Sequence, residues 1–144
     1  MTALREVLGE TLLGFDHVGL AVDDLEASIA TWESMGLTMT HREINYEQGV
    51  DEAMIAVPGG TFIQLLSPLT QDTTIGHFLA KHGEGMQQMA FRVTDIEQAM
   101  TLVLKAGKHL IYPEPRIGTN GSRINFLHPS DMGGILIELV EHVA

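Results

Sequence analysis

The predicted fold depends on the sequence FDHVGLAVDDLE, residues 15–26. Its apolar run has the composition of a β-strand, and the acidic residues that end it are typical of a helix N-terminus. Side chains alternate between the two faces of a strand, so His17 shares its face with Gly19 and Ala21, which carry almost no side-chain bulk. We therefore expect an imidazole above a surface that has room for a ligand.

A related stretch, MQQMAFRVTDIE, occurs at residues 86–97, and when the two stretches are aligned Gln88 corresponds to His17. A second pair of related segments follows, FIQLL at residues 62–66 and LIELV at residues 136–140. Each of these two segments holds one polar residue within an apolar run. The chain is therefore predicted to contain two copies of one structural module.

The polar residues in these strands occupy repeat-related places, at His17, Gln64, Gln88 and Glu138. A polar side chain buried in a strand costs free energy unless a partner satisfies it. One shared partner would account for all four residues, and a metal ion suits that role. We therefore expect these four side chains to converge.

Each module is predicted to consist of a strand, a helix and three further strands. In the first module the helix is expected at residues 23–35 and the later strands at 37–44, 52–57 and 61–66. In the second, a strand is expected at 87–93, a helix at 96–106 and strands at 109–112, 123–128 and 135–140. A lead-in at residues 1–14, a short helix at 75–81 and a loop at 113–121 complete the prediction.

These elements predict an α+β fold in which two tandem βαβββ modules form one eight-stranded, cup-shaped sheet. The repeats are residues 15–67 and 86–141, within a single domain of residues 15–144. Each module alone is too small to bury its own sheet well. We therefore expect the two to pair around one cavity.

Composition narrows the possible functions. Hydrophobic residues make up 44% of the 144 residues, which is sufficient for a core, and the absence of cysteine excludes disulfides and thiolate metal sites. The formal net charge of -11 argues against nucleic acid as a partner. No signal-peptide pattern and no membrane-spanning stretch is present, so we expect a cytoplasmic protein.

Several separated segments carry a more specific resemblance: DHVGLAV, EQGVDEAM, IQLLSP, FLAKHGEGM, YPEPRIGTNGSRINFLHP and GGILIELV. From about residue 15 to the C-terminus the chain resembles the methylmalonyl-CoA epimerases of the vicinal oxygen chelate superfamily. One position departs from the family pattern. The family normally carries His-His where this chain has Gln87-Gln88, and the second histidine would be a metal ligand.

The resemblance implies an isomerase that interconverts (2R)- and (2S)-methylmalonyl-CoA through removal of the C2 proton. Its divalent metal would stabilise the resulting enolate, and the implied ligands are His17, Gln64, Gln88 and Glu138. These mostly hard oxygen donors suit cobalt, manganese, magnesium or zinc. The resemblance also implies a homodimer.

Glu52 aligns with the family's proposed catalytic glutamate and is the expected base, with Glu47 and Asp51 as nearby alternatives. The substrate is an anionic acyl-CoA thioester, which needs local cations in so acidic a chain. The candidate cations are Lys81, Arg92, Arg116 and Arg123.

Gln88 leaves three possibilities open: it ligates the metal through its amide oxygen, it binds a metal-bound water, or the metal is lost. The first is preferred, because Gln64 is already an amide in the ligand set. Two other functions remain open. One is an epimerase for another 2-alkylmalonyl thioester, and the other is a metal-free protein that binds small molecules or acyl thioesters. A facial triad of two histidines and a carboxylate, as in non-haem iron dioxygenases, cannot be assembled from these positions.

Overall fold

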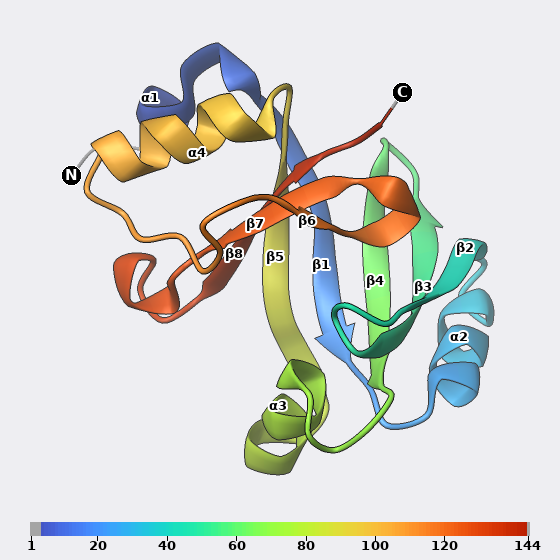
Figure 1. Ribbon diagram of the computed structural model, residues 1–144. Helices are drawn as coiled ribbons and strands as arrows, with labels where there is room; N and C mark the ends of the chain where they lie inside the picture. The colour runs from blue at the N-terminus through green and yellow to red at the C-terminus, as the bar shows by residue number, and fades with distance from the viewer. Residues whose placement is uncertain (1–3, 144) are drawn as a thin grey trace. The chain divides into compact units, whose positions relative to one another are not determined.

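The computed structural model describes residues 4–143 as a sheet with helices beside it (Figure 1). The strands are β1 (Leu12–Ala21), β2 (Thr38–Asn45), β3 (Val50–Val57), β4 (Thr61–Pro68), β5 (Gly85–Val93), β6 (Arg116–Ile117), β7 (Arg123–Leu127) and β8 (Leu136–Glu141). The helices are α1 (Leu4–Leu8), α2 (Leu25–Glu33), α3 (Thr74–His82) and α4 (Ile96–Lys105), with single 3-10 turns at Gly9–Thr11, Thr119–Gly121 and Pro129–Asp131.

The eight strands belong to one sheet, in the order β2-β3-β4-β1-β5-β8-β7-β6. The order within each half is the same, because β6-β7-β8-β5 repeats the sequence β2-β3-β4-β1. The predicted α+β class, with two βαβββ modules and an eight-stranded sheet, is confirmed.

The chain forms two compact units, and the boundaries between them fall within β1 and within β5. One unit consists of His17–Gln88, and the other combines the described residues up to Asp16 with those from Met89 onward. The boundaries predicted for the single domain and its two repeats stay a prediction. Each unit is described separately below.

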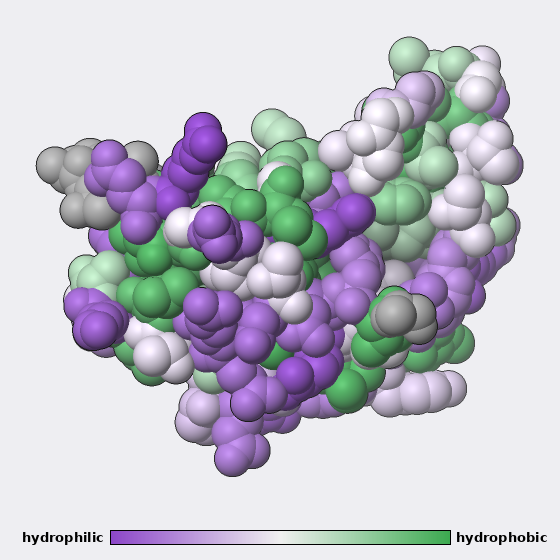
Figure 2. Space-filling model, turned by 90° about the horizontal axis from the view of Figure 1, so that it is seen from above, coloured by the Kyte–Doolittle hydropathy of each residue, from purple (hydrophilic) through white to green (hydrophobic). Residues whose placement is uncertain are grey.

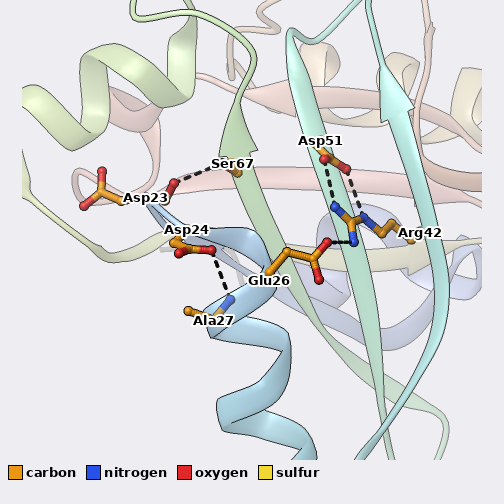
Figure 3. Close-up of polar contacts among 7 residues, drawn as sticks. All are labelled: Asp23, Asp24, Glu26, Ala27, Arg42, Asp51 and Ser67. Atoms are coloured by element: carbon orange, nitrogen blue, oxygen red, sulfur yellow. Dashed lines mark hydrogen bonds and ion pairs between the residues drawn. The ribbon is translucent and has the colours of Figure 1, made fainter.

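In the unit His17–Gln88, helix α2 begins at Leu25, two residues after the predicted start. The side chain of Asp24 accepts a hydrogen bond from the backbone N–H of Ala27 at 3.1 Å, which caps the helix N-terminus (Figure 3). The buried face of α2 presents Leu25 and Ile29 to the sheet. These side chains pack with Val22, which follows β1, and with Ala53 and Ile55 of β3 and Leu65 of β4.

The opposite face of the same strands is covered at one end by α3. Its Ile75 packs against Ala21, Val50 and Leu66, each of which is 5% exposed or less. The remainder of this face carries the polar residues described in the next subsection. The first module therefore has an apolar face toward α2 and a partly polar face beside α3.

An arginine joins three elements of this unit (Figure 3). Arg42 on β2 donates to both carboxylate oxygens of Asp51 on β3, at 3.4 and 3.2 Å, and also to Glu26 on α2. These hydrogen bonds, first to Asp51 and then to Glu26, raise the pKa of the guanidinium above its ordinary value. Arg42 is therefore an anchor between helix and strands.

The second unit has a core of the same kind beneath α4, which lies beside α1 in Figure 1. Asp95 caps α4 by accepting from the backbone N–H of Gln98 at 3.0 Å. The buried residues of this core are Leu8, Val93, Ile96, Ala99, Met100, Val103, Leu127, Ile137 and Leu139. A smaller cluster on the other face contains Ala90, Ile124, Phe126 and Val140.

The strand predicted at residues 109–112 is wrong. In its place Leu110 makes one isolated bridge to Leu127, and the side chain of Asn125 accepts from the backbone N–H of Tyr112 at 3.2 Å. The regular strand here is the two-residue β6, inside the segment predicted as a loop. Pro113 and Pro115 lack the N–H groups that a continuous ladder needs.

The predicted lead-in at residues 1–14 contains more structure than expected. Helix α1 occupies Leu4–Leu8, and β1 begins at Leu12 instead of residue 15. Residues 1–3 lie outside the described part of the chain.

The exterior is mixed in character. In the view from above, hydrophilic residues lie between apolar patches (Figure 2). Among the helices of residues 4–143, none has both the length and the apolar character needed to cross a membrane.

Candidate active site

Strand register brings three of the predicted site residues onto one face of the unit His17–Gln88. Gln64 on β4 pairs with Gly19 on β1 and with Met54 on β3. His17 is two residues from Gly19, and Glu52 is two residues from Met54, so both share the face of Gln64. This arrangement follows from the pairing of β1, β3 and β4.

A chain of hydrogen bonds connects three buried side chains on this face. The Nε2 group of Gln88 donates to Oε1 of Gln64 at 3.2 Å, and Nε2 of Gln64 donates to Oε2 of Glu52 at 3.1 Å. Gln88, Gln64 and Glu52 are 8%, 4% and 3% exposed, respectively. The structure therefore places the proposed base Glu52 in direct contact with the predicted ligand Gln64.

The surface above Gly19 is not open, in contrast to the expectation from sequence. A Cβ atom at Gly19 would lie 2.6 Å from Cγ of Gln88 and 3.2 Å from its Nε2. The missing side chain at Gly19 thus gives Gln88 the space to reach Gln64. The role of this glycine is therefore to make room for the side chain of Gln88.

His17 is 3% exposed on the same face. Within residues 4–143, no three His, Cys, Asp or Glu side chains come together in a way that could hold a metal ion. The predicted ligand set differs from such a group, because two of its four members are glutamines.

Glu138, the remaining predicted ligand, belongs to the other unit. It lies on β8 opposite Phe126 of β7 in the strand register and is 4% exposed. Phe126 and the neighbouring Val140 belong to the smaller apolar cluster of that unit. Glu138 is thus a buried carboxylate in an otherwise apolar strand, as predicted from the repeat.

The two alternative bases are placed differently from Glu52. Glu47 is exposed in the turn between β2 and β3, where the backbone N–H of Gln48 donates to Asn45 Oδ1 at 3.0 Å. Asp51 points to Arg42, as described above. Both carboxylate oxygens of Asp51 are therefore engaged by Arg42, which makes Asp51 a weaker candidate for the base than Glu52.

The candidate cations for an anionic substrate are mostly engaged by the protein itself. Arg92 pairs with Asp16 at 2.7 Å, Arg123 with Glu97 at 2.5 Å, and the Arg116 guanidinium lies 4.5 Å from the centre of the Tyr112 ring. The hydrogen bond to Glu97 raises the pKa of Arg123 above its ordinary value. Lys81 is exposed.

Sequence reasoning missed a polar cluster around the buried Asp16, the residue before His17 in the chain. Asp16 is fully buried and accepts from Nη2 of Arg92 and is joined to Nε2 of His142, each at 2.7 Å. The available signal was an aspartate inside an apolar strand, which needs partners when buried. The cluster belongs to the unit that contains α4.

Comparison with known proteins gives strong matches over most of the chain. Residues 16–126 match the Glyoxalase/Bleomycin resistance protein/Dioxygenase superfamily. The ethylmalonyl-CoA/methylmalonyl-CoA epimerase of Cereibacter sphaeroides is 35% identical over 127 residues, which cover 86% of this chain and 94% of that protein.

Solved structures agree with this match. Methylmalonyl-CoA epimerase from Mycobacterium tuberculosis superposes with a TM-score of 0.92 at 44% identity, covering 100% of this chain and 94% of that one. A variant of Streptomyces coelicolor methylmalonyl-CoA epimerase, in complex with 2-nitronate-propionyl-CoA, gives a TM-score of 0.88 at 40% identity, covering 92% and 99%. The predicted relationship to epimerases, which are isomerases, is confirmed. The chain therefore belongs to the glyoxalase/bleomycin resistance protein/dioxygenase superfamily and, within it, to the methylmalonyl-CoA epimerase family.

Proposed function

We propose that the protein catalyses metal-dependent epimerisation of methylmalonyl-CoA at C2. The observation that carries the proposal is the buried face on which His17 lies with the hydrogen-bonded side chains of Gln64 and Gln88. Further support comes from relatives, since a methylmalonyl-CoA epimerase 41% identical to this chain is known in complex with methylmalonyl-CoA. The substrate class follows from these proteins.

The donors on this chain fit a divalent cation. An imidazole at His17, an amide oxygen at Gln64 and a carboxylate at Glu138 are each at most 4% exposed, and Gln88 is 8% exposed. Nitrogen and oxygen donors of this type suit cobalt, manganese, magnesium or zinc. When bound, the cation would supply Lewis-acid stabilisation of the negative charge that develops on the substrate oxygens, commonly worth several kcal/mol.

The protein must also move a proton. A base removes the C2 proton from one face of the substrate, and a proton is returned from the other face to invert the centre. Glu52 is the proposed base, because it lies in the segment EQGVDEAM that resembles the epimerase family. Its carboxylate lies in the buried site through the hydrogen bond from Gln64.

Glu47 is the second candidate base. Variants of the Streptomyces enzyme with the nitronate ligand replace a glutamate in one case and, in another, a glutamine seventeen positions further along that chain. Glu47 precedes Gln64 by the same number of positions here. Its exposed turn leaves it accessible to a substrate, whereas Glu52 is buried.

The test is proton exchange at C2 in heavy water. The protein is incubated with (2R)-methylmalonyl-CoA, with and without added cobalt, and deuterium incorporation is followed by mass spectrometry. We expect cobalt-dependent incorporation. Absence of incorporation with cobalt, manganese, magnesium and zinc would refute the proposed reaction.

The two bases are separated by Glu52→Gln and Glu47→Gln in the same assay. Loss of exchange in only one variant, measured at a cobalt concentration that saturates both variants, assigns the base to that residue. Retained exchange in Glu52→Gln removes Glu52 from the role.

We propose that Gln88 contributes its amide oxygen to the metal. Its Nε2 group donates to Gln64, so ligation by Gln88 uses Oε1. An imidazole is a stronger donor than an amide oxygen, so Gln88→His should tighten cobalt binding. An unaltered cobalt affinity would place Gln88 outside the coordination sphere.

Ethylmalonyl-CoA is a second candidate substrate, favoured by the Cereibacter relative whose name includes both thioesters. The exchange assay with both substrates compares them directly. A metal-free binding protein is the remaining alternative from sequence. It would bind the thioester tightly without metal and without C2 exchange.

A homodimer is also proposed. Leu13 and Phe15 are 58% and 43% exposed on β1, and the Phe15 ring packs edge-on against Phe91 at 5.9 Å. Exposed apolar residues in a strand are suited to cover by a second copy. Light scattering after size-exclusion chromatography tests this, and a cytoplasmic location stays a prediction.

A further inference from the structure

Three buried side chains form a hydrogen-bonded series with a defined direction, from Gln88 through Gln64 to Glu52. Gln64 is the central member and uses both ends of its carboxamide: Nε2 donates to Glu52, and Oε1 accepts from Gln88. A carboxamide can be rotated to exchange its oxygen and nitrogen with little change in shape. Something must therefore decide which end of Gln64 faces the site.

We propose that Glu52 is a positioning residue that fixes the rotation of the Gln64 carboxamide. Oε2 of Glu52 accepts from Nε2 of Gln64, and a carboxylate oxygen in the role of acceptor favours the NH2 end of the carboxamide over its oxygen. The oxygen of Gln64 is then directed to the opposite side, where Gln88 lies. Glu52 thereby presents an acceptor oxygen, instead of a donor nitrogen, at the predicted ligand position.

Burial makes this control strict. Gln64 and Glu52 are 4% and 3% exposed, so solvent does not compensate for a rotated amide. A rotated Gln64 would place its oxygen against the Glu52 carboxylate and its NH2 group against the NH2 group of Gln88. Both contacts are repulsive, and unsatisfied buried polar groups are costly.

The same face shows how the series is held together. Met54 and Gly19 flank Gln64 on the neighbouring strands, and the missing side chain at Gly19 leaves the space for Gln88. Glu52 is a neighbour of Gln64 because β3 and β4 pair in this register. The positioning role does not depend on whether Glu52 or Glu47 removes the substrate proton, although its value for catalysis rests on the proposed metal site.

The test compares Glu52→Leu, which removes the acceptor, with Glu52→Gln, which keeps one acceptor oxygen. The matched control is Glu43→Leu, because Glu43 lies opposite Glu52 in the β2–β3 register and hydrogen-bonds to His41. Cobalt binding to the whole chain is measured by isothermal titration calorimetry. Circular dichroism verifies that each variant is folded.

Loss of a group that orients a metal ligand typically weakens metal affinity about ten- to a hundredfold. We expect a loss of this size in Glu52→Leu, a smaller loss in Glu52→Gln and none in Glu43→Leu. Cobalt affinity in Glu52→Leu equal to that of the unmodified chain would overturn the proposal. A purely structural role would not produce partial rescue by the glutamine.

A second readout needs neither metal nor turnover. Side-chain amide protons of Gln64, observed by nuclear magnetic resonance, should exchange slowly with water in the unmodified chain and in Glu43→Leu. They should exchange faster in Glu52→Gln, which also covers the case in which Glu52→Leu does not fold. An unchanged rate of amide-proton exchange for Gln64 in Glu52→Gln would contradict this positioning role, even if the chain binds no cobalt. If the Gln64 amide is protected as expected but the substrate shows no C2 exchange, only the proposed reaction is refuted.

Discussion

The two modules have cores of the same kind but differ in the strand that follows the helix. In the unit His17–Gln88 this strand is the eight-residue β2, of which seven residues pair with β3, whereas the corresponding β6 has two. Both strands stand at the ends of the sheet order. The repeat is therefore retained in the central strands, which pack against helices. It is lost between the two edge strands, because an edge strand has a neighbouring strand on one side only.

The largest expected effect tests whether the two cores are equivalent. Leu65 on β4 and Leu139 on β8 are both fully buried, so each replacement by alanine should cost about 2–5 kcal/mol of unfolding free energy. Urea unfolding followed by circular dichroism measures both. Leu104→Ala, at a position 53% exposed, is the control and should change little. A much smaller loss in Leu139→Ala than in Leu65→Ala would show that the second core is less closely packed.

A second prediction concerns the irregular edge of the second module. A Cβ atom at Gly118 would lie 2.7 Å from Cγ2 of Ile124 and 2.8 Å from Oγ of Ser122. Gly118→Ala should therefore destabilise the protein by about 1–3 kcal/mol, because overpacking forces neighbours to move. Gly85→Ala, where nothing lies within 4 Å of the added atom, is the matched control. Equal urea midpoints for the two variants would mean that this edge is loosely packed.

The helix caps should behave alike in both modules. Asp24→Ala and Asp95→Ala each remove an acceptor for a first-turn N–H group, which typically costs about 1 kcal/mol. Thermal unfolding of the two variants, with Glu33→Ala as an exposed control on α2, measures the difference. A cost in one variant alone would break the equivalence of the two helix starts.

The smallest effect is a pH dependence in the second module. Hydrogen bonds from the His109 side chain and backbone lower the pKa of Asp131 below its ordinary 3.8. The stabilisation from this lowered pKa is present above 3.8 and is lost as the pH falls through the lowered value. Asp131→Asn should therefore lower the melting temperature at neutral pH, and the deficit should vanish in strong acid. A deficit that is constant over this range would exclude ionisation as its cause.

Local sequence signals predicted the elements that depend on local chemistry. Asp24 and Asp95 precede apolar residues at helical spacing, and both helices begin there. The single polar residues in the two related apolar segments, Gln64 and Glu138, are buried as expected. These features need no knowledge of distant strands.

Features that depend on strand register were not predicted. The contact between Glu52 and Gln64 exists because the turn at Gly59 and Gly60, with φ values of 102° and 85°, sets how β3 pairs with β4. A shift of one residue in this pairing would move Glu52 to the other face. Likewise, the local sequence does not indicate that the side chain of Gln88 fills the space at Gly19.

The parallel pairing of β1 with β4 also affects how the first module folds. His17 is aligned with Phe62 and Ala21 with Leu66, so β1 must wait for a strand made much later in synthesis. The antiparallel β2, β3 and β4 can pair locally before then, whereas contacts between distant segments form slowly. The N-terminal strand is consequently the part of the module that stays unpaired longest on the ribosome, where it is most open to chaperones and to misassembly with other chains.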